Sequence, residues 1–319
     1  MKKKILIIGS DPNSINSEII YKCWKSLKLE EKNQIYLISN YKLLLEQFKV
    51  LKYPIKLLKV KNIDDDTKTK RLKIINIDIK FKDPFKVSIN NSSIFIKKSF
   101  DKAHKIALSG KVIGIINCPL NKKLLKTNQG VTEYLASKCK IKDNSEVMLI
   151  KNKNFAVSPI TTHINLKNVV KKISKNLIIK KINTINNWYK KNLNIKPNIG
   201  VLGINPHNGE LRKNSEEIKI ILPAIKKLKK NGFNVYGPLA ADTVFINDYI
   251  NYDIILGMYH DQVLAPFKTI FKFDAINLTL GLKYLRLSPD HGVASNIIKK
   301  GIANKTSLLK CIEFLTKLK

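Results

Sequence analysis

Short runs of apolar, mostly β-branched residues alternate with longer amphipathic segments along most of this chain. The runs "KILIIGS", "NQIYLIS" and "KVIGIINCP" have the length and composition of buried strands. Amphipathic segments such as "SEIIYKCWKSLK" and "YKLLLEQFKVLKY" follow the first two of them. A strand followed by a helix, repeated, predicts an α/β fold with a largely parallel sheet covered by helices. With 319 residues and 44% hydrophobic content, the chain can form two domains or one large one.

Local signals mark several element boundaries. Gly110 follows "FDKAHKIALS" and Gly232 follows "EEIKIILPAIKKLKKN", each where a left-handed residue closes a helix. Residues 145–163 predict two strands around the polar turn "KNKN". Residues 167–192 predict one long helix with an apolar stripe and a solvated lysine face. Further strands are expected at "NIGVLGINP", "FNVYGPL" and "YDIILGM".

The formal charge of +35 comes almost entirely from lysine, because the arginines are only Arg71, Arg212 and Arg286. The lysines are scattered along the chain among many Ile and Asn residues, as a genome-wide codon bias produces. A nucleic-acid reader uses arginine forks and stacked aromatic side chains gathered in one element. Neither occurs here, so we expect no nucleic-acid partner.

The four cysteines lie far apart and form no C-x-x-C pair, which indicates neither a zinc knuckle nor a disulfide framework. This fits a reducing cytoplasm. The apolar run in the start "MKKKILIIGSDP" is too short for a signal peptide, and no run is long enough to cross a bilayer. We therefore expect a cytoplasmic protein without a membrane partner.

Three of the five histidines follow apolar runs by only a few residues. They are His163 in "SPITTHINL", His207 in "GVLGINPHNGE" and His260 in "DIILGMYHDQ". Ligands collect at the carboxyl ends of parallel strands, and three imidazoles with one open position would suit a catalytic divalent metal. A single histidine at a strand end is more often structural, and the separations match no local ligand spacing. The pattern alone leaves both interpretations open.

Three candidate anion ligands, Lys268, Asn277 and Arg286, lie beyond the strand end that carries His260. In a chain that uses lysine nearly everywhere, Arg286 suggests a need for a planar fork that binds phosphate or carboxylate, although a surface arginine is the alternative. No G-x-G-x-x-G follows a strand and no G-x-x-x-x-G-K-[ST] occurs. A nucleotide would have to bind in another way.

Six segments resemble, in this order, the signature blocks of the 4-hydroxythreonine-4-phosphate dehydrogenase family of pyridoxal phosphate biosynthesis: "TNQGVTEYLA", "TTHINLKNV", "GINPHNGE", "GPLAADTVF", "MYHDQVLAPFK" and "INLTLGLKYLRLSPDHGVA". The resemblance extends from about residue 9 to the C-terminus. It implies two α/β domains around a cleft, similar to the isocitrate and isopropylmalate dehydrogenases, which would explain the missing Rossmann glycines. The expected domains are residues 1–128 with 290–319, and residues 129–289, which carry the metal ligands and the dimer interface.

The resemblance also implies roles for particular residues. His163, His207 and His260 would bind a divalent metal (Zn, Mg or Co) in an active site that two subunits of a homodimer share. Asp242, Asp261 and Lys268 would act as catalytic residues. The substrate's phosphate and carboxylate would be held by Thr132, Lys268, Asn277 and Arg286.

The implied reaction is the oxidation and decarboxylation of 4-phosphohydroxy-L-threonine to 3-amino-2-oxopropyl phosphate, with NAD as the hydride acceptor and NADP as the alternative. The metal favours loss of the hydroxyl proton while hydride passes to the nicotinamide. The ketone that results is β to the carboxylate. The same electrophile can therefore assist the loss of carbon dioxide.

The chain departs from the family pattern at "GVTE", where the family usually has a histidine in place of Val131. Losing a charge-assisted contact with the substrate costs on the order of 1.5–3 kcal/mol. Asn128 or Gln129 could replace that contact. The first loop, "GSDPNSINSEII", has Ser14 and Asn16 where glycines are usual and Ser17 in place of a proline, and "LRKNSEE" lacks the glycines expected after "NPHNGE".

Two alternatives follow from these departures. One is a dehydrogenase of the same superfamily that acts on threonate or erythronate 4-phosphate, with Val131 as the position of the switch. The other is a non-catalytic basic binding protein, which the retained histidines and Arg286 disfavour.

Overall fold

The structure is a computed structural model that describes residues 4–65, 68–125, 130–141 and 143–318. It divides into two compact units, residues 1–131 with 283–318 and residues 132–282. The predicted domain border at 128–129 lies at residues outside the described ranges. The predicted border at 289–290 lies a few residues beyond the second boundary of these units.

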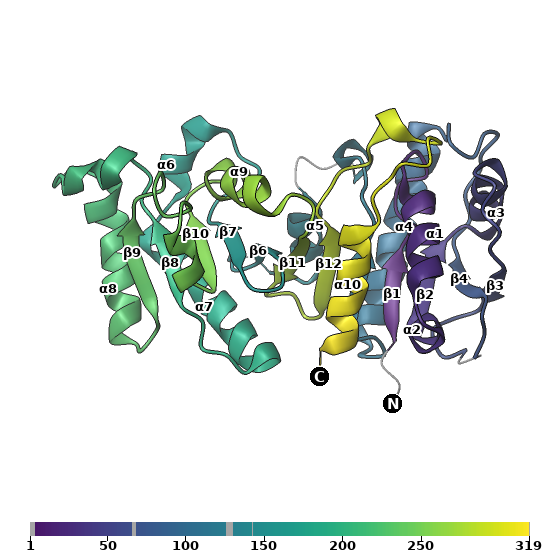
Figure 1. Cartoon of the computed structure of the whole chain (residues 1–319), viewed down its shortest axis with the longest axis horizontal. Helices are drawn as coiled ribbons and strands as arrows, with labels where there is room; N and C mark the ends of the chain where they lie inside the picture. The colour runs from purple at the N-terminus through teal and green to yellow at the C-terminus, as the bar shows by residue number, and fades with distance from the viewer. Residues whose placement is uncertain (1–3, 66–67, 126–129, 142, 319) are drawn as a thin grey trace. The chain divides into compact units, whose positions relative to one another are not determined.

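The first unit contains a parallel sheet with the strand order β3-β4-β2-β1-β5-β12 (Figure 1). Its strands are β1 (Ile5–Ile8), β2 (Ile35–Ser39), β3 (Leu57–Val60), β4 (Leu72–Asn76), β5 (Gly114–Asn117) and β12 (Leu285–Pro289). Every residue of β1 is buried, as a central parallel strand covered on both faces requires. The predicted strands at "ILII", "IYLIS" and "GIIN" are confirmed, whereas β3, β4 and β12 were not predicted.

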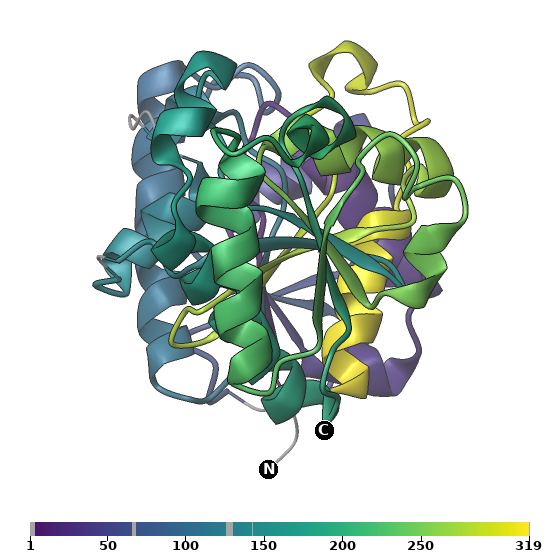
Figure 2. The same ribbon diagram turned by 90° about the vertical axis from the view of Figure 1, so that its left-hand side faces the viewer.

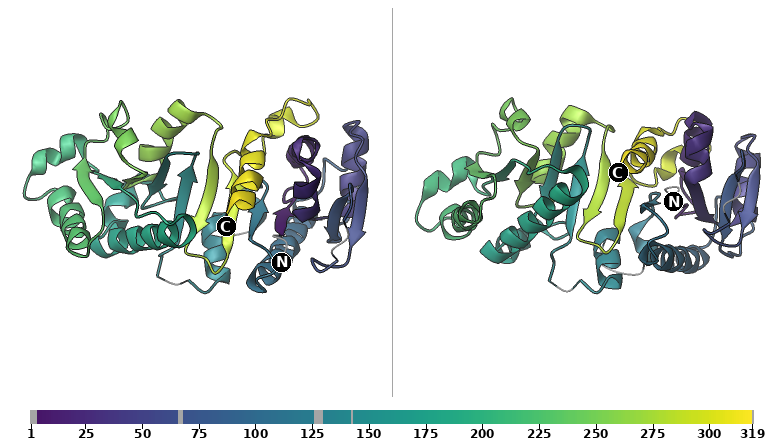
Figure 3. Two further views of the ribbon diagram at one scale, coloured as in Figure 1. Left: turned by 60° about the horizontal axis from the view of Figure 1, so that its bottom comes forward. Right: turned by 90° about the horizontal axis from the view of Figure 1, so that it is seen from below.

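Helices cover both faces of this sheet. They are α1 (Asn16–Ser26), α2 (Leu29–Gln34), α3 (Tyr41–Val50), α4 (Ile89–Leu108) and α10 (Thr306–Lys317), with short 3-10 turns at Lys122–Leu125 and Ser295–Ile297. Figure 3 shows α1 and α10 on one face of the strands and α4 on the other. The alternation of strands and helices predicted from the sequence is confirmed in this unit.

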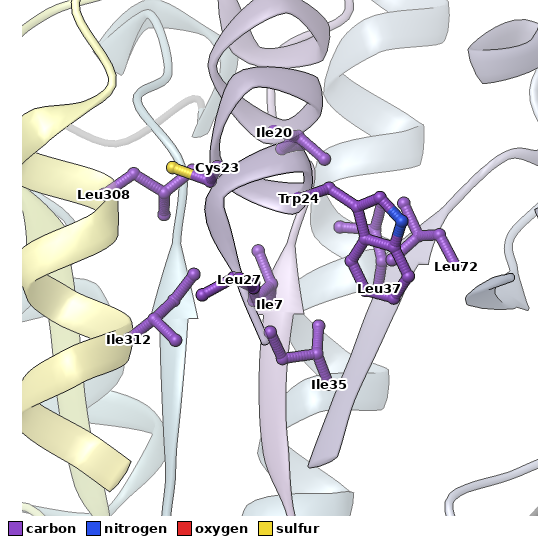
Figure 4. A pocket seen from close by; sticks show the side chains of 10 residues that line it. All are labelled: Ile7, Ile20, Cys23, Trp24, Leu27, Ile35, Leu37, Leu72, Leu308 and Ile312. Atoms are coloured by element: carbon purple, nitrogen blue, oxygen red, sulfur yellow. The ribbon is translucent and has the colours of Figure 1, made fainter. Parts of the chain in front are cut away.

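A small cavity of about 10 Å³ lies between α1, α10 and the strands of the first unit. Its lining is aliphatic apart from Cys23 and Trp24, as Figure 4 shows. The volume is close to the minimum for one water, but the walls offer a water few hydrogen-bond partners, so the cavity is expected to stay dry. It is a packing gap and has neither the size nor the polar groups to bind a phosphorylated substrate.

The altered first loop is closed by its own polar side chains. Asn16 Nδ2 donates to the carbonyl oxygens of Gly9 (2.9 Å) and Pro119 (2.8 Å), and Ser14 Oγ donates to the carbonyl of Asp11 (2.6 Å). Neither Ser14 nor Asn16 has a positive φ. The loop therefore places no demand for glycine at these two positions, and the substitutions cause no backbone strain there.

The second unit contains a mixed sheet with the order β11-β6-β7-β10-β8-β9. Its strands are β6 (Val147–Lys151), β7 (Ala156–Pro159), β8 (Ile199–Leu202), β9 (Val235–Leu239), β10 (Ile254–Gly257) and β11 (Ile276–Leu280). Strands β7, β10, β8 and β9 are parallel, while β6 is antiparallel to both β7 and β11. Figure 2 shows the twist of these strands from the side of this unit. The hairpin and the three strands predicted after Pro197 are confirmed.

The regular helices of the second unit are α5 (Val131–Lys138), α6 (Val169–Lys172), α7 (Lys175–Leu193), α8 (Leu222–Lys230) and α9 (His260–Phe271). Shorter turns occupy Leu166–Asn168, Pro206–Leu211 and Asp248–Asn251, and a π-helical turn, Glu217–Ile221, precedes α8. Figure 3 shows α7 and α8 on one face of the sheet and α9 on the other. Val263 and Phe267 of α9 pack with Val157 and Ile255 of the strands in one apolar core.

The prediction of a single helix over 167–192 was wrong. The segment forms a 3-10 turn, the short α6, and then α7, which begins after Ser174. Ser174 is extended, and its Oγ accepts a hydrogen bond from the amide of Leu177 (3.2 Å), so it caps α7 instead of continuing α6. The lysine face is also not wholly solvated, because Lys181 is buried and its Nζ donates to the carbonyl of Glu146.

The predicted helix ends at Gly110 and Gly232 are confirmed, and both glycines have left-handed φ values, of +71° and +78° respectively.

We expect Gly232→Ala to lower the free energy of unfolding by about 1 kcal/mol, because an L-residue is strained at this left-handed φ. A steric clash is not the cause, since the added Cβ meets no described atom within 4 Å. Gly292→Ala is the matched control, since its Cβ is equally unobstructed by described atoms and its φ is not left-handed. Urea unfolding of both variants measures the difference, and equal losses would contradict the strain argument.

All four cysteines are free and buried. Burial raises the pKa of Cys23 to about 12 and also raises the pKa values of Cys118 and Cys311. Such thiols behave as small apolar side chains, not as nucleophiles. No helix among the described residues has both the length and the apolar character needed to span a membrane.

Candidate active site

The strand ends of β7 and β10 are joined by hydrogen bonds that fix the loop carrying His163. The amide of Ile160 donates to the carbonyl of Gly257 (2.8 Å), and the Thr161 hydroxyl donates to the carbonyl of Met258 (2.7 Å). His163 follows two residues after Thr161, and His260 follows two residues after Met258. The rings of His163 and His260 lie with their centroids 5.8 Å apart.

His260 is the first residue of α9, and its neighbours in "YHDQ" fix the turn from β10. Its Nδ1 lies 2.6 Å from Oδ1 of Asp261, which is exposed. The Gln262 side chain accepts from the amide of Met258 (2.7 Å) and donates to the carbonyl of Gly203 (2.7 Å), so it joins the ends of β10 and β8. These polar residues therefore lie at the end of a buried strand, where they fix the chain and support the histidine.

A second carboxylate, Glu133 in the first turn of α5, lies beside His163. Glu133 Oε1 accepts a hydrogen bond from the Thr162 hydroxyl (2.7 Å) and lies 3.6 Å from His163 Nδ1, an ion-pair distance slightly longer than a hydrogen bond. Burial alone would raise the pKa of Glu133, but the contacts with His163 and Thr162 lower it to about 2. The carboxylate is therefore ionised near neutral pH.

The pair of histidines fits a metal site in its donor chemistry. Two imidazoles on one ion, each nitrogen about 2.0–2.1 Å from a zinc, have their ring centres roughly 5 Å apart. The observed 5.8 Å is close to that separation. Among the described residues of one chain, however, no group of three or more His, Cys, Asp and Glu residues could hold a metal ion. The structure thus brings two of the three predicted ligands together and does not add His207 to them.

His207 lies in an unusual turn after β8. Residues 207–211 all have left-handed φ values, between +48° and +59°. Each non-glycine residue in this conformation costs on the order of 1 kcal/mol, so the turn must be held by other contacts. The carboxylate of Glu217, fully buried, accepts from the amides of Ile204 (2.8 Å) and Asn205 (2.9 Å) at the base of the turn.

Glu217 remains ionised in this place. Burial would raise its pKa, but the hydrogen bonds from Asn205 and Ile204 hold that pKa below its usual value. An open, polar pocket of about 470 Å³ lies over the turn, and His207, Glu210 and Arg212 are among the residues that line it. His207 itself is exposed. The turn therefore presents the His207 side chain at the surface of the chain.

Two of the predicted substrate ligands lie on one surface of the second unit. Thr132, in the first turn of α5, is buried, and its hydroxyl lies 3.2 Å from that of Thr279 in β11. Asn277 is two residues before Thr279 and so points to the same face of the strand. Asn277 Oδ1 is buried and has no hydrogen-bond partner among the described residues. Glu133 follows Thr132 directly in the sequence. The first turn of α5 therefore contacts both Thr279 of β11, through Thr132, and His163, through Glu133.

The other predicted residues of this unit are exposed. Lys268 lies in α9, two turns after His260, and Asp242 lies in the loop after β9.

Arg286 belongs to the first unit, in β12, and is not the surface arginine that the sequence left open. Its side chain is 3% exposed, and its Nε donates to Oδ1 of Asn117 at the end of β5 (2.7 Å). A buried guanidinium held at a strand end keeps its planar fork fixed. Val131 is half-buried at the start of α5, and Asn128 and Gln129, the residues that could replace the family histidine, lie outside the described residues.

The sequence analysis assigned no role to Glu133, Gln262 or Glu217. The sequence did contain a hint for the two glutamates. Acidic residues are scarce in this chain, 24 against 59 basic ones, and both glutamates stand in or next to segments that were predicted to form the site. Their hydrogen-bond partners belong to other segments of the chain, and only the structure shows them.

Solved structures identify the class of fold. A crystal structure of a 4-hydroxythreonine-4-phosphate dehydrogenase from Klebsiella pneumoniae has a TM-score of 0.85 with 28% identity and covers 98% of each chain. An isocitrate dehydrogenase from Methylococcus capsulatus, at 9% identity and a TM-score of 0.50, shows the fold alone and covers 99% of this chain and 85% of its own. The protein thus has the α/β fold of the isocitrate dehydrogenase-like class, as predicted.

Sequence comparisons identify the family. The family "Pyridoxal phosphate biosynthetic protein PdxA" matches residues 31–315. The 4-hydroxythreonine-4-phosphate dehydrogenase of Sulfurihydrogenibium sp. is 36% identical and is aligned over 99% of this chain and 98% of its own length. A protein of Oceanobacillus iheyensis, provisionally named a D-threonate 4-phosphate dehydrogenase, is 33% identical over 98% of this chain and 96% of its own. The chain belongs to the PdxA family and is an oxidoreductase, so the alternative of a non-catalytic binding protein was wrong.

Proposed function

We propose that this protein is a 4-hydroxythreonine-4-phosphate dehydrogenase that oxidises and decarboxylates 4-phosphohydroxy-L-threonine to 3-amino-2-oxopropyl phosphate with NAD as the hydride acceptor. The observation that carries the proposal is the pair of His163 and His260 at adjacent strand ends, each with a carboxylate at Nδ1. Membership of the PdxA family supports the assignment of the substrate. NADP is the alternative acceptor, and the cytoplasm is the expected compartment.

The two paired histidines fit a divalent metal (Zn, Mg or Co), which would polarise the substrate hydroxyl and stabilise the enolate that forms as carbon dioxide leaves. His163 and His260 would bind this ion through Nε2. In the described part of one chain the third ligand is lacking, and His207 is exposed on the left-handed turn after β8. We therefore propose a homodimer in which His207 of a second copy completes the set.

Substrate binding would begin at the first turn of α5. A helix N-terminus favours an anion, because its backbone amides and dipole are oriented towards negative charge. The Thr132 hydroxyl lies in this turn, and Asn277 Oδ1 on β11 is buried without a hydrogen-bond partner among the described residues. With Lys268 and Arg286 they would hold the phosphate and carboxylate and orient the hydroxyl carbon for hydride transfer. Asp261 would keep the His260 ring oriented and, with Asp242 and Lys268, would serve proton transfer.

The test is NAD reduction by the purified full-length protein on 4-phosphohydroxy-L-threonine, with and without a chelator. We expect turnover that the chelator abolishes and that an added divalent metal restores. Turnover that persists after complete metal removal would refute the metal-assisted reaction. The oligomeric state, measured by light scattering, checks the homodimer in the same sample.

D-Threonate 4-phosphate is the second candidate substrate. The Oceanobacillus iheyensis relative favours it, as does Val131, which cannot make the polar contact that a histidine makes at this position. Parallel assays with threonate and erythronate 4-phosphates distinguish the two. A higher kcat/KM for either sugar-acid phosphate would assign the protein to that reaction.

A further inference from the structure

The carboxylate of Glu133, on a half-buried side chain, is neither a proposed metal ligand nor a proposed substrate ligand, yet it lies beside His163. Its Oε1 accepts from the Thr162 hydroxyl (2.7 Å) and lies 3.6 Å from His163 Nδ1. Its Oε2 is buried and has no hydrogen-bond partner among the described residues. A buried, unsatisfied polar atom is costly, more so when the group is charged, and one bond from a neutral hydroxyl does not offset this cost.

A cationic partner beside Glu133 would offset it. The His163 ring is such a candidate, because its Nδ1 lies 3.6 Å from Oε1 of Glu133. An imidazole that binds a metal through Nε2 carries a proton on Nδ1 and shares the charge of the ion, and such rings almost always donate that N–H to a carboxylate, a carbonyl or water. Asp261 stands in the same relation to His260 Nδ1, at 2.6 Å. Each paired histidine thus has a carboxylate beside its Nδ1, although the Glu133 oxygen lies farther away, at 3.6 Å.

We infer that Glu133 is a positioning residue, which orients the His163 ring through Nδ1 and leaves Nε2 for the divalent metal; this rests on the proposed metal-assisted function. Thr162 holds the carboxylate in place, because its hydroxyl donates to the same Oε1 that faces the ring. Glu133 also follows Thr132 directly, at the start of α5. The first turn of α5 therefore positions both Thr132, a candidate substrate ligand, and Glu133, which orients the candidate metal ligand His163.

The experiment compares Glu133→Gln with the full-length wild-type protein. Zn²⁺ affinity is measured by competition with a chromophoric chelator. We expect Glu133→Gln to weaken Zn²⁺ binding by on the order of tenfold, as loss of a carboxylate behind a histidine ligand commonly does. Glu46→Gln is the matched control, because Glu46 forms an exposed ion pair with Lys49 in the first unit. Thermal unfolding without metal verifies that both variants are folded.

A second measurement is independent of activity. The ¹⁵N chemical shifts of the imidazole nitrogens show which one carries the proton in the metal-free protein. We expect the His163 ring of the wild type to be protonated on Nδ1, and the Glu133→Gln ring to shift towards the Nε2-protonated tautomer. Thr162→Val should cause a smaller shift in the same direction, because it loosens the carboxylate without removing it.

The outcomes separate this inference from the proposed function. Wild-type protein that binds Zn²⁺, together with a folded Glu133→Gln variant of unchanged affinity and unchanged His163 tautomer, would overturn the role of Glu133 alone. Wild-type protein that binds no divalent metal would overturn the metal-assisted function itself. If excess Zn²⁺ restores dehydrogenase activity to Glu133→Gln, the residue acts through metal binding, as we infer.

Discussion

Replacing His260 with alanine is expected to lower kcat for the dehydrogenase reaction by on the order of 10³-fold. His260 is proposed as a metal ligand, it lies beside His163, and its Nδ1 is already held by Asp261. A metal ion that stabilises developing charge supplies several kcal/mol, and about 4 kcal/mol corresponds to a thousandfold change in rate. Steady-state NAD reduction with saturating substrate and added metal measures the loss.

The control for this prediction is His104→Ala. His104 lies in α4 of the first unit, and its Nδ1 is 2.8 Å from the Tyr284 hydroxyl, so it is a hydrogen-bonded histidine outside the proposed site. We expect this variant to retain kcat within a few-fold. Metal content of both variants, measured after dialysis, should fall only for His260→Ala. A His260→Ala enzyme that keeps both its metal and its kcat would show that the paired histidines are structural.

Replacing Arg286 with lysine is expected to raise KM for the phosphorylated substrate by on the order of 10- to 100-fold. The substitution keeps the charge but removes the planar fork, and the lost charge-assisted hydrogen bonds are worth about 1.5–3 kcal/mol. Arg286 is nearly fully buried, and the bond from its Nε to Asn117 orients it. Initial rates over a range of substrate concentrations separate KM from kcat.

Arg71→Lys is the matched control, because Arg71 is exposed in the same unit. It should leave KM unchanged. Since lysine cannot reproduce the bond to Asn117, Arg286→Lys could also reduce stability, and a urea unfolding curve separates that effect from binding. A folded Arg286→Lys variant with wild-type KM would show that Arg286 serves the sheet of the first unit and not the substrate.

Periodicity and local chemistry predicted most of the elements. The strands β1, β2 and β5 are short, mainly apolar runs rich in Ile, and every residue in them is buried, as expected for strands of a parallel sheet covered on both faces. The glycines at 110 and 232 close their helices because a left-handed residue is favoured there. A helix-boundary signal was missed at Ser174, which is extended and caps the start of α7 through its side chain.

The sequence could also name His163 and His260, because both follow strands whose ends converge. It could not show that these rings lie side by side. That depends on the bonds from Ile160 and Thr161 to the end of β10, which connect segments almost 100 residues apart. Nor could it show the left-handed turn at His207, since that conformation is disfavoured for each residue alone and persists because Glu217 holds its base.

The sequence by itself determined the α/β class, the main strand and helix positions and, through its motifs, the family. Tertiary structure decided which carboxylate lies beside which histidine and which polar groups are buried. The physical reason is the range of the interactions. Strand and helix preferences depend on neighbours a few residues away, whereas the position of Glu133 beside His163 depends on packing that brings α5 against the end of β7.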